Sequence, residues 1–395
     1  MKRGILILTL MNAALAAGVS ALRAEGGSNP SFTPASYYGD NDLREYFEAS
    51  EMMRRFSEST VALFSPSNIP LDPATGEYKL KNLTLGGKYN LREGEAFGGQ
   101  PVGAYCSGVL VGEDLVLTAG HCFKPHPRGG PCDKVKLVFG YAVNRAGSAP
   151  SSFPAANVYG CSAILAQQVR EQSPSGGGIH FTCRNGQCTN REVNGNGADY
   201  ALVRLDRKVR GRVPLAISRT DVSAGDSVGA IGHPSGLPVK IQEEGAAVRT
   251  VTREGFFTAN LDAFGGNSGS PVFDMRTFRV AGILIRGGVD YVYTSPSSTS
   301  TVVEDPSNPY LYNPGQANYY PQDGGRGEDV TLISEVQALI PRTEMEAALE
   351  SVGRPRQGGE ARPVPAVYTP GQGGYQVQPA VYTVPEVSGP EMISI

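Results

Sequence analysis

The sequence has no excess of positive charge. Its 395 residues carry a formal net charge of -3, and 18% of them are charged. Proteins that bind nucleic acid or anionic lipid usually concentrate Lys and Arg in basic patches. We therefore expect neither a nucleic acid nor a lipid surface as a partner.

Long apolar runs are absent beyond the N-terminus, so no later segment is expected to cross a membrane. Basic residues, then an apolar run over residues 4–19, then small residues are typical of an export signal. We predict a signal peptide over residues 1–24, with cleavage after Ala21 or Ala24. Because the uncharged residues 4–22 approach the length of a membrane span, an uncleaved anchor is the alternative. The mature chain is expected to be secreted or periplasmic.

The six cysteines include no paired C-x-x-C set of the kind that binds structural zinc. In an exported chain an even number of cysteines indicates disulfides, so we predict three disulfides, no metal site and no cofactor. Arithmetic alone allows many pairings. The pairs that we expect are Cys183 with Cys188 as a local loop staple, Cys106 with Cys122, and Cys132 with Cys161.

Turn-forming residues are frequent, with 50 glycines and 29 prolines. From about residue 60 to 348, short apolar segments alternate with clusters of Gly, Pro, Asn and Asp, which is typical of an all-β fold. Within this region, residues 172–197 are rich in Gly, Ser and Asn, and we expect a surface insertion there. Residues 349–395 are rich in Pro and Gly, repeat the motif Pro-Ala-Val-Tyr-Thr and have few aliphatic side chains, so we predict a disordered tail.

Residues 25–59 contain the pattern of an amphipathic helix. Asp40-Asn41-Asp42 is expected to cap it, and apolar side chains follow at roughly helical spacing. These side chains are Leu43, Tyr46, Phe47, Met53 and Phe56. The segment is either a pro-segment removed on maturation or a permanent brace against the folded domain.

Predicted strands carry polar residues at their ends. Residues 105–111 and 115–119 form one hairpin, residues 201–205 form a strand, and residues 271–274 and 278–285 form a second hairpin. Functional residues concentrate at such strand ends and loops.

Ser268 lies in the run Gly265-Gly266-Asn267-Ser268-Gly269-Ser270-Pro271, whose glycines permit unusual backbone dihedrals. A serine hydroxyl attacks an acyl carbon when a base removes its proton and backbone N–H groups wait where the oxyanion forms. The amides of Gly266 and Ser268 are the candidates for that oxyanion hole. A polar, Gly-rich hairpin turn is the alternative interpretation.

Such a base is expected among four histidines. His126 lies between two prolines and His180 follows three glycines, so we expect both to be exposed. His233 fits a turn, or else a residue that lines a substrate cleft. His121 follows an apolar strand and adjoins a cysteine that can anchor its loop, which makes it the best base. A base also needs a buried carboxylate on its other ring nitrogen, and Asp199, at the entrance of an apolar strand, fits that role as well as that of a loop-end aspartate.

Three blocks occur in the order Thr-Ala-Gly-His-Cys, Asp-Tyr-Ala-Leu and Gly-Asn-Ser-Gly-Ser-Pro, and they contain His121, Asp199 and Ser268. They resemble the signature blocks of the trypsin-like (chymotrypsin-fold) serine peptidases, especially the bacterial branch that includes glutamyl endopeptidases. Subtilisin-like and α/β-hydrolase enzymes arrange the same trio in other orders. The resemblance implies an all-β fold of two packed antiparallel six-stranded β-barrels, over about residues 60–210 and 211–348, with the active site between them.

By this resemblance, His121 is the general base, Asp199 orients it, and Ser268 is the nucleophile. The amides of Gly266 and Ser268 form the oxyanion hole. The resemblance also supports the pairing of Cys106 with Cys122, which matches a bridge beside the catalytic histidine.

The sequence departs from the animal enzymes in two ways. Asn267 replaces the aspartate that receives their new N-terminus on activation, so that switch is absent. No cysteine follows Cys188, so their pocket-edge disulfide is missing.

Substrate-binding candidates are Asp262, Arg286 and Gly287. Asp262 precedes Ser268 by six positions, where trypsin-like enzymes with basic preference place a pocket aspartate. Arg286 and Gly287 end the strand that in the family pairs with the substrate backbone. Arg286 would favour an acidic substrate residue, or it is simply a solvated side chain. We lean to cleavage after Lys or Arg.

We therefore predict a secreted serine endopeptidase that hydrolyses peptide bonds through an acyl-enzyme on Ser268. Proteins or peptides are the expected substrates, and we expect a monomer. The alternatives are a catalytically inactive homologue that binds proteins, a Glu-specific endopeptidase, and an esterase or acyltransferase that uses the same three residues.

Overall fold

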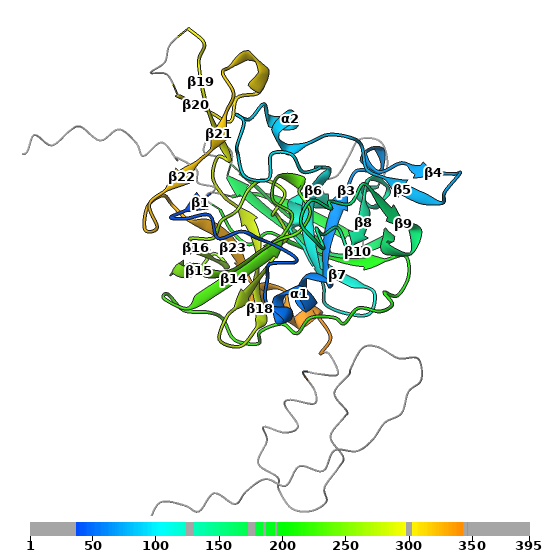
Figure 1. The fold of residues 1–395 in the computed structure, drawn as a ribbon. Coiled ribbons are helices and arrows are strands. Elements are labelled where there is room, and N and C mark those ends of the chain that lie inside the picture. The colour runs from blue at the N-terminus through cyan, green and yellow to red at the C-terminus, as the bar shows by residue number, and fades with distance from the viewer. Residues whose placement is uncertain are drawn as a thin grey trace, which may run out of the picture.

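Two closed β-barrels lie side by side in the computed structural model (Figure 1). The structure describes residues 37–123, 130–172, 178–184, 187–193, 196–297, 302–342 and 346. The signal peptide, His126 and the tail from residue 349 lie outside these ranges, so the predictions about them stay predictions. Among the described residues, no helix is long and apolar enough to cross a membrane.

The first barrel has six antiparallel strands in the order β10-β13-β7-β6-β3-β8, and the pairing of β8 with β10 closes it. The strands are β3 (Thr60–Phe64), β6 (Ala104–Leu110), β7 (Leu115–Thr118), β8 (Lys136–Phe139), β10 (Val158–Gln172) and β13 (Tyr200–Leu205). The predicted hairpin of residues 105–119 is the β6–β7 pair.

The second barrel has the order β14-β17-β18-β23-β16-β15, and β14 pairs with β15 to close it. Its strands are β14 (Ser227–Gly232), β15 (Lys240–Val251), β16 (Phe256–Ala259), β17 (Pro271–Asp274), β18 (Arg279–Arg286) and β23 (Glu328–Leu332). The expected all-β fold of two six-stranded barrels is thus confirmed.

Apolar side chains hold the barrels together. Val61 and Leu117 of the first barrel belong to the same buried cluster as Ile241, Phe273 and Ile283 of the second. Burial of such side chains stabilises a fold by about 1.5–3 kcal/mol each. Because the core continues from one barrel to the other, the loops between them have a fixed relative position.

The N-terminal segment packs on the second barrel. The expected N-terminal helix is present but shorter than the pattern indicates. It is α1 (Glu51–Ser57), and Ser50 caps it, not Asp40-Asn41-Asp42. The preceding β2 (Arg44–Glu45) instead pairs with the edge of β15. The buried Lys240 ammonium lies 3.2 Å from the Glu45 carboxylate, which explains why this stretch is extended.

Smaller elements decorate the barrels. The segment predicted as a surface insertion is a hairpin that continues β10. An arm of β19, β20 and β21 projects at the top of Figure 1. The remaining strands are β1 (Tyr37–Tyr38), β4 (Leu71–Asp72), β5 (Glu77–Lys79), β9 (Ser152–Pro154), β11 (Gly178–Arg184), β12 (Gln187–Val193), β19 (Tyr291–Thr294), β20 (Val302–Glu304), β21 (Gln316–Ala317) and β22 (Tyr319–Tyr320).

The short helices lie mostly in connections between strands. They are α2 (Leu85–Tyr89) and the 3₁₀ helices η1 (Pro66–Asn68), η2 (Gly120–Phe123), η3 (Pro131–Lys134), η4 (Ala155–Asn157), η5 (Pro234–Gly236), η6 (Pro309–Leu311), η7 (Ile333–Glu335) and η8 (Gln337–Leu339).

Two of the expected disulfides are present. They join Cys106 to Cys122 and Cys132 to Cys161. The strand register places residue 183 opposite residue 188 in the β11–β12 hairpin. Their side chains lie outside the described part of the structure, so the third disulfide stays a prediction.

Candidate active site

His121 and Asp199 meet at one end of the first barrel. His121 lies in η2 directly after β7, and Asp199 directly precedes β13, the strand that pairs with β7. The imidazole Nδ1 lies 3.1 Å from Asp199 Oδ2, and the His121 backbone N–H donates to Oδ1 at 3.1 Å. The carboxylate therefore fixes both the backbone and the ring of the histidine.

Burial differs between the two side chains. The Asp199 side chain is fully buried, whereas that of His121 is 18% exposed. Thr331 of β23 supports the aspartate from the second barrel, because its Oγ1 accepts from the Asp199 N–H at 2.9 Å and donates to the Asp199 carbonyl at 2.8 Å. A buried carboxylate behind a partly exposed imidazole suits an orienting group behind a base.

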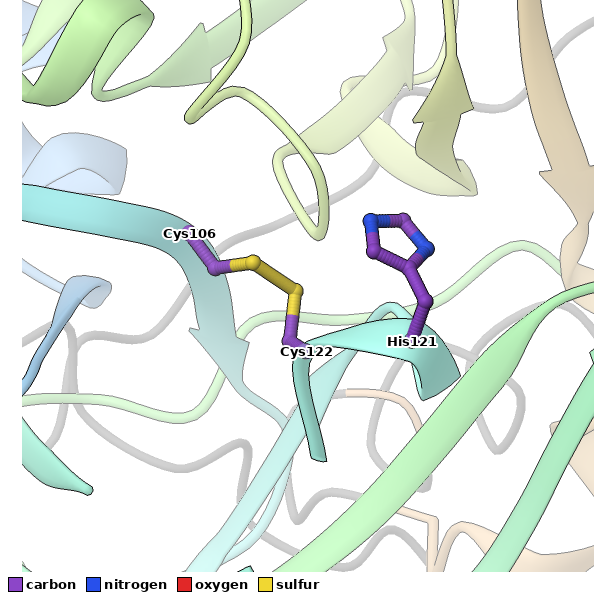
Figure 2. Close-up of side chains that lie close together, drawn as sticks. All are labelled: Cys106, His121 and Cys122. Atoms are coloured by element: carbon purple, nitrogen blue, oxygen red, sulfur yellow. A yellow bond between two sulfur atoms is a disulfide. The ribbon is translucent and has the colours of Figure 1, made fainter. Parts of the chain in front are cut away.

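Ser268 lies on the loop between β16 and β17, here called the nucleophile loop (residues 260–270). Its carbonyl oxygen is 3.7 Å from Cys122 Sγ. A ring nitrogen of His121 lies within 4.8 Å of both sulfur atoms of the Cys106–Cys122 disulfide. The nucleophile loop and the imidazole therefore flank the same disulfide, whose place beside His121 is seen in Figure 2. Because the two sulfur atoms are bonded to each other, they offer no thiolate to a metal ion.

Hydrogen bonds hold every carbonyl group of the nucleophile loop from residue 265 to 268. The donor–acceptor pairs are Ser235 N to Gly265 O at 2.6 Å, Ser107 Oγ to Gly266 O at 2.8 Å, Ser270 N to Asn267 O at 2.8 Å, and Ser107 N to Ser268 O at 2.8 Å. In a trans peptide the C=O and the following N–H point in opposite directions. The Gly266 and Ser268 amides therefore point away from the donors that hold Gly265 and Asn267.

These two amides are the ones that the sequence predicts for an oxyanion hole. Neither donates a hydrogen bond to any described residue. Gly266 has φ +100°, and a Cβ built there would lie 2.7 Å from the His233 carbonyl oxygen, so only glycine fits. The loop thus presents two backbone N–H donors, and the positive φ that glycine allows at residue 266 makes this backbone geometry possible.

Residues 106–283 match the family model of the trypsin-like peptidase domain. With two closed six-stranded barrels, this match decides the fold class. The fold is chymotrypsin-like. Among curated proteins none matches the chain.

Solved structures similar to this chain include a protease of M. tuberculosis in its active form, with 15% identity over 81% of this chain and 95% of that chain, and a TM-score of 0.35. Human heparin binding protein has 14% identity over 80% of this chain and 99% of that one, with a TM-score of 0.35. A serine endoprotease from Yersinia pestis has 12% identity over 64% of this chain and 60% of its own, with a TM-score of 0.32.

In this chymotrypsin-like fold, Asp262 holds the N-terminal segment. Its carboxylate is 2% exposed and accepts the backbone N–H groups of Tyr38 at 2.9 Å and Asp42 at 2.8 Å. Burial raises the pKa of Asp262 to about 7, although the two N–H donors oppose the rise. No local sequence pattern indicates this partnership with a segment more than two hundred positions away.

Arg286 is engaged within the protein. Its guanidinium lies 3.0 Å from Asp329 Oδ2 and donates to the carbonyls of Arg170 and Gly197. Gly287, the third pocket candidate, is exposed, and a methyl group built on it would overlap the buried Glu328 carboxylate. Of the three substrate-binding candidates, Asp262 lies in the nucleophile loop, and only Gly287 is exposed.

His233 lies in the core, not at a surface. It is 1% exposed, its Nδ1 lies 3.0 Å from the Leu237 carbonyl, and its ring stacks on Tyr141. Burial lowers the pKa of His233 to about 3, so it is neutral at physiological pH. It supports the turn that holds Ser235, as one of the two sequence interpretations expects.

Three residues that support the site carry no motif that predicts this role: Ser107, Ser235 and Thr331. Each binds a backbone group of the nucleophile loop or of Asp199. Ser107 left one signal: it is a polar side chain within an otherwise apolar strand, and it is fully buried. Buried polar groups need partners, so such a serine marks a specific hydrogen bond.

Proposed function

We propose that the protein is an exported serine endopeptidase that uses His121, Asp199 and Ser268. The observation that carries the proposal is the buried Asp199 carboxylate on His121 Nδ1, next to a nucleophile loop whose Gly266 and Ser268 amides have no acceptor among the described residues. The match to the trypsin-like peptidase domain supports the same chemistry.

In the proposed reaction, the Ser268 hydroxyl attacks a peptide carbonyl carbon while the other ring nitrogen of His121 takes its proton. Asp199 stabilises the imidazolium, and the two amides bind the oxyanion. The imidazolium then gives its proton to the leaving amine, which leaves an acyl group on Ser268. A water molecule, deprotonated by the same imidazole, hydrolyses this ester and frees Ser268.

Loss of the Ser268 hydroxyl is expected to abolish this route. Ser268→Ala should lower kcat on peptide substrates by about 10⁴- to 10⁶-fold, and a fluorophosphonate should label the wild type but not the variant. Ser270→Ala, which changes a neighbouring serine of the same loop, tests whether labelling is specific to Ser268. Unlabelled wild-type protein would support the inactive homologue instead, and near-wild-type turnover by Ser268→Ala would dismiss the assignment.

The proposal includes a preference for Lys or Arg before the scissile bond. Two acidic side chains lie beside the substrate-binding candidates. Asp290 accepts the Gly265 N–H at 2.8 Å, and burial raises its pKa to about 7. Glu328 lies directly behind Gly287, and burial raises its pKa well above the usual range. The candidate cation Arg286 is engaged by Asp329, which disfavours its use in a Glu-specific pocket.

Cleavage-site mapping on a random peptide mixture measures this preference. We expect Lys and Arg before the cleaved bond, and we expect Asp290→Asn to reduce their advantage over neutral residues by about tenfold at about pH 8, where this carboxyl is mostly ionised. Val302→Thr, an exposed change on the projecting arm, serves as the control. Cleavage after Glu by the wild type would contradict the preference without contradicting the peptidase chemistry.

Export and a permanent N-terminal brace complete the proposal. The two disulfides suit a secreted or periplasmic protein. Met53 of α1 is fully buried, and the Phe56 ring stacks on Phe273 at 5.3 Å. Removal of residues 37–58 would expose this apolar surface, so the contacts favour a brace over a pro-segment.

A further inference from the structure

Ser107 of β6 makes hydrogen bonds at two points of the nucleophile loop. Its Oγ donates to the Gly266 carbonyl, and its backbone N–H donates to the Ser268 carbonyl, each at 2.8 Å. The side chain is fully buried, and β6 belongs to the first barrel, whereas the loop belongs to the second. One residue of the first barrel thus contacts the peptides before and after the amide of Ser268.

The hydroxyl proton of Ser107 has a fixed direction. The His233 backbone N–H donates to Ser107 Oγ at 2.9 Å, so this oxygen is already an acceptor on one side. Its own proton is then directed to the Gly266 carbonyl. Because His233 is itself buried, the sequence His233 N–H, Ser107 O–H, Gly266 C=O is a hydrogen-bond chain shielded from water.

Of the four described donors to the carbonyls of residues 265–268, Ser107 Oγ is the only side chain; the others are backbone amides. Substitution can therefore remove this bond alone. Without it, the Gly266–Asn267 peptide would keep only the bond from its Asn267 N–H to the Phe264 carbonyl at 2.9 Å, next to a glycine, which tolerates several backbone conformations. Rotation of that peptide would displace the Ser268 amide.

We propose that Ser107 is a positioning residue, whose hydroxyl holds the Gly266 and Ser268 amides in the orientation needed to bind an oxyanion. This inference rests on the proposed function. Ser107 is not proposed to contact the substrate. Its substitution should therefore change kcat and not substrate binding.

The test compares Ser107→Ala with Ser59→Ala. Ser59 is a matched control, because it is 2% exposed and its Oγ donates to the Val213 carbonyl at 2.7 Å, with no contact to the nucleophile loop. Both variants lose one buried hydroxyl. Measurements are kcat and KM on one peptide substrate, the inhibition constant of the matching peptide aldehyde, and the unfolding midpoint in urea.

For Ser107→Ala we expect kcat to fall about 10- to 100-fold, with KM changed by less than about threefold. The aldehyde adds to Ser268 and places an oxyanion between the two amides, so its affinity should weaken by a similar factor. Ser59→Ala should lower the unfolding midpoint comparably but keep kcat within about twofold. The proposal is overturned by unchanged kcat in Ser107→Ala, by aldehyde affinity that does not follow kcat, or by an equal loss of kcat in Ser59→Ala.

A second pair of variants guards against misfolding of Ser107→Ala. Thr and Val have nearly the same shape, so Ser107→Thr and Ser107→Val differ only in the hydroxyl. We expect the Thr variant to turn over at least about tenfold faster than the Val variant, and equal rates would refute the role of the hydroxyl. Failure of the proposed function is distinct: the wild type itself would then not react with a fluorophosphonate.

Discussion

Two buried aspartates, Asp199 and Asp262, bind different partners. The Asp199 carboxylate accepts one backbone N–H and faces a partly exposed imidazole. The Asp262 carboxylate accepts two backbone N–H groups, those of Tyr38 and Asp42, and faces no described cationic side chain within 4 Å. The first arrangement joins a carboxylate to a group that titrates and meets solvent, and the second joins a carboxylate to the backbone alone.

This difference teaches that burial by itself does not make an aspartate catalytic. Asp262 lies in the nucleophile loop, and Asp199 contacts His121 beside it. In the sequence, both positions match aspartates of the trypsin-like pattern. The two carboxylates differ in what their partners can do. An imidazole can accept and release a proton, whereas a backbone amide only donates a hydrogen bond.

Of the two aspartates, Asp199 is the one whose substitution should have the larger effect on kcat. Asp199→Asn keeps the shape but replaces an acceptor with a donor group, so the imidazole loses the partner that fixes its tautomer. We expect kcat to fall by about 10⁴-fold, with little change in KM. The matched change Asp262→Asn should lower kcat by less than about tenfold. Similar losses in the two variants, measured on one substrate, would remove the distinction.

A smaller effect concerns the pH dependence of stability. Burial raises the pKa of Asp262 from 3.8 to about 7, so the folded protein holds this proton where the unfolded chain has released it. Its contribution is then fully present below about pH 4 and is lost as the pH rises towards 7. The free energy of unfolding of the wild type, relative to Asp262→Asn, should therefore decrease over this range. Urea unfolding at several pH values measures the difference, and a constant difference would show that the pKa is not raised.

Much of the barrel structure and the site follows from local sequence patterns. The apolar stretches around His121 and Asp199 mark β7 and β13, because a short continuous run of buried apolar residues leaves a short-range signal. The glycines around Ser268 mark a loop with unusual dihedrals. These features need only neighbouring residues to be recognised.

Other features depend on contacts between distant segments. The β2 strand has two residues, and its pairing with β15 is set by Glu45 reaching Lys240. The bond from Ser107 to Gly266 likewise spans two barrels. No local pattern encodes such partners, so the N-terminal segment was expected to be helical where it is extended.

Both barrels form hydrogen bonds with the nucleophile loop, and this has a consequence for the order of events during folding. Ser107 reaches the loop from one barrel, and Leu284, which accepts the Gly269 N–H at 2.7 Å, reaches it from the other. In the proposed function, neither barrel alone holds the two amides in place, so hydrolysis would begin only after the two barrels have docked.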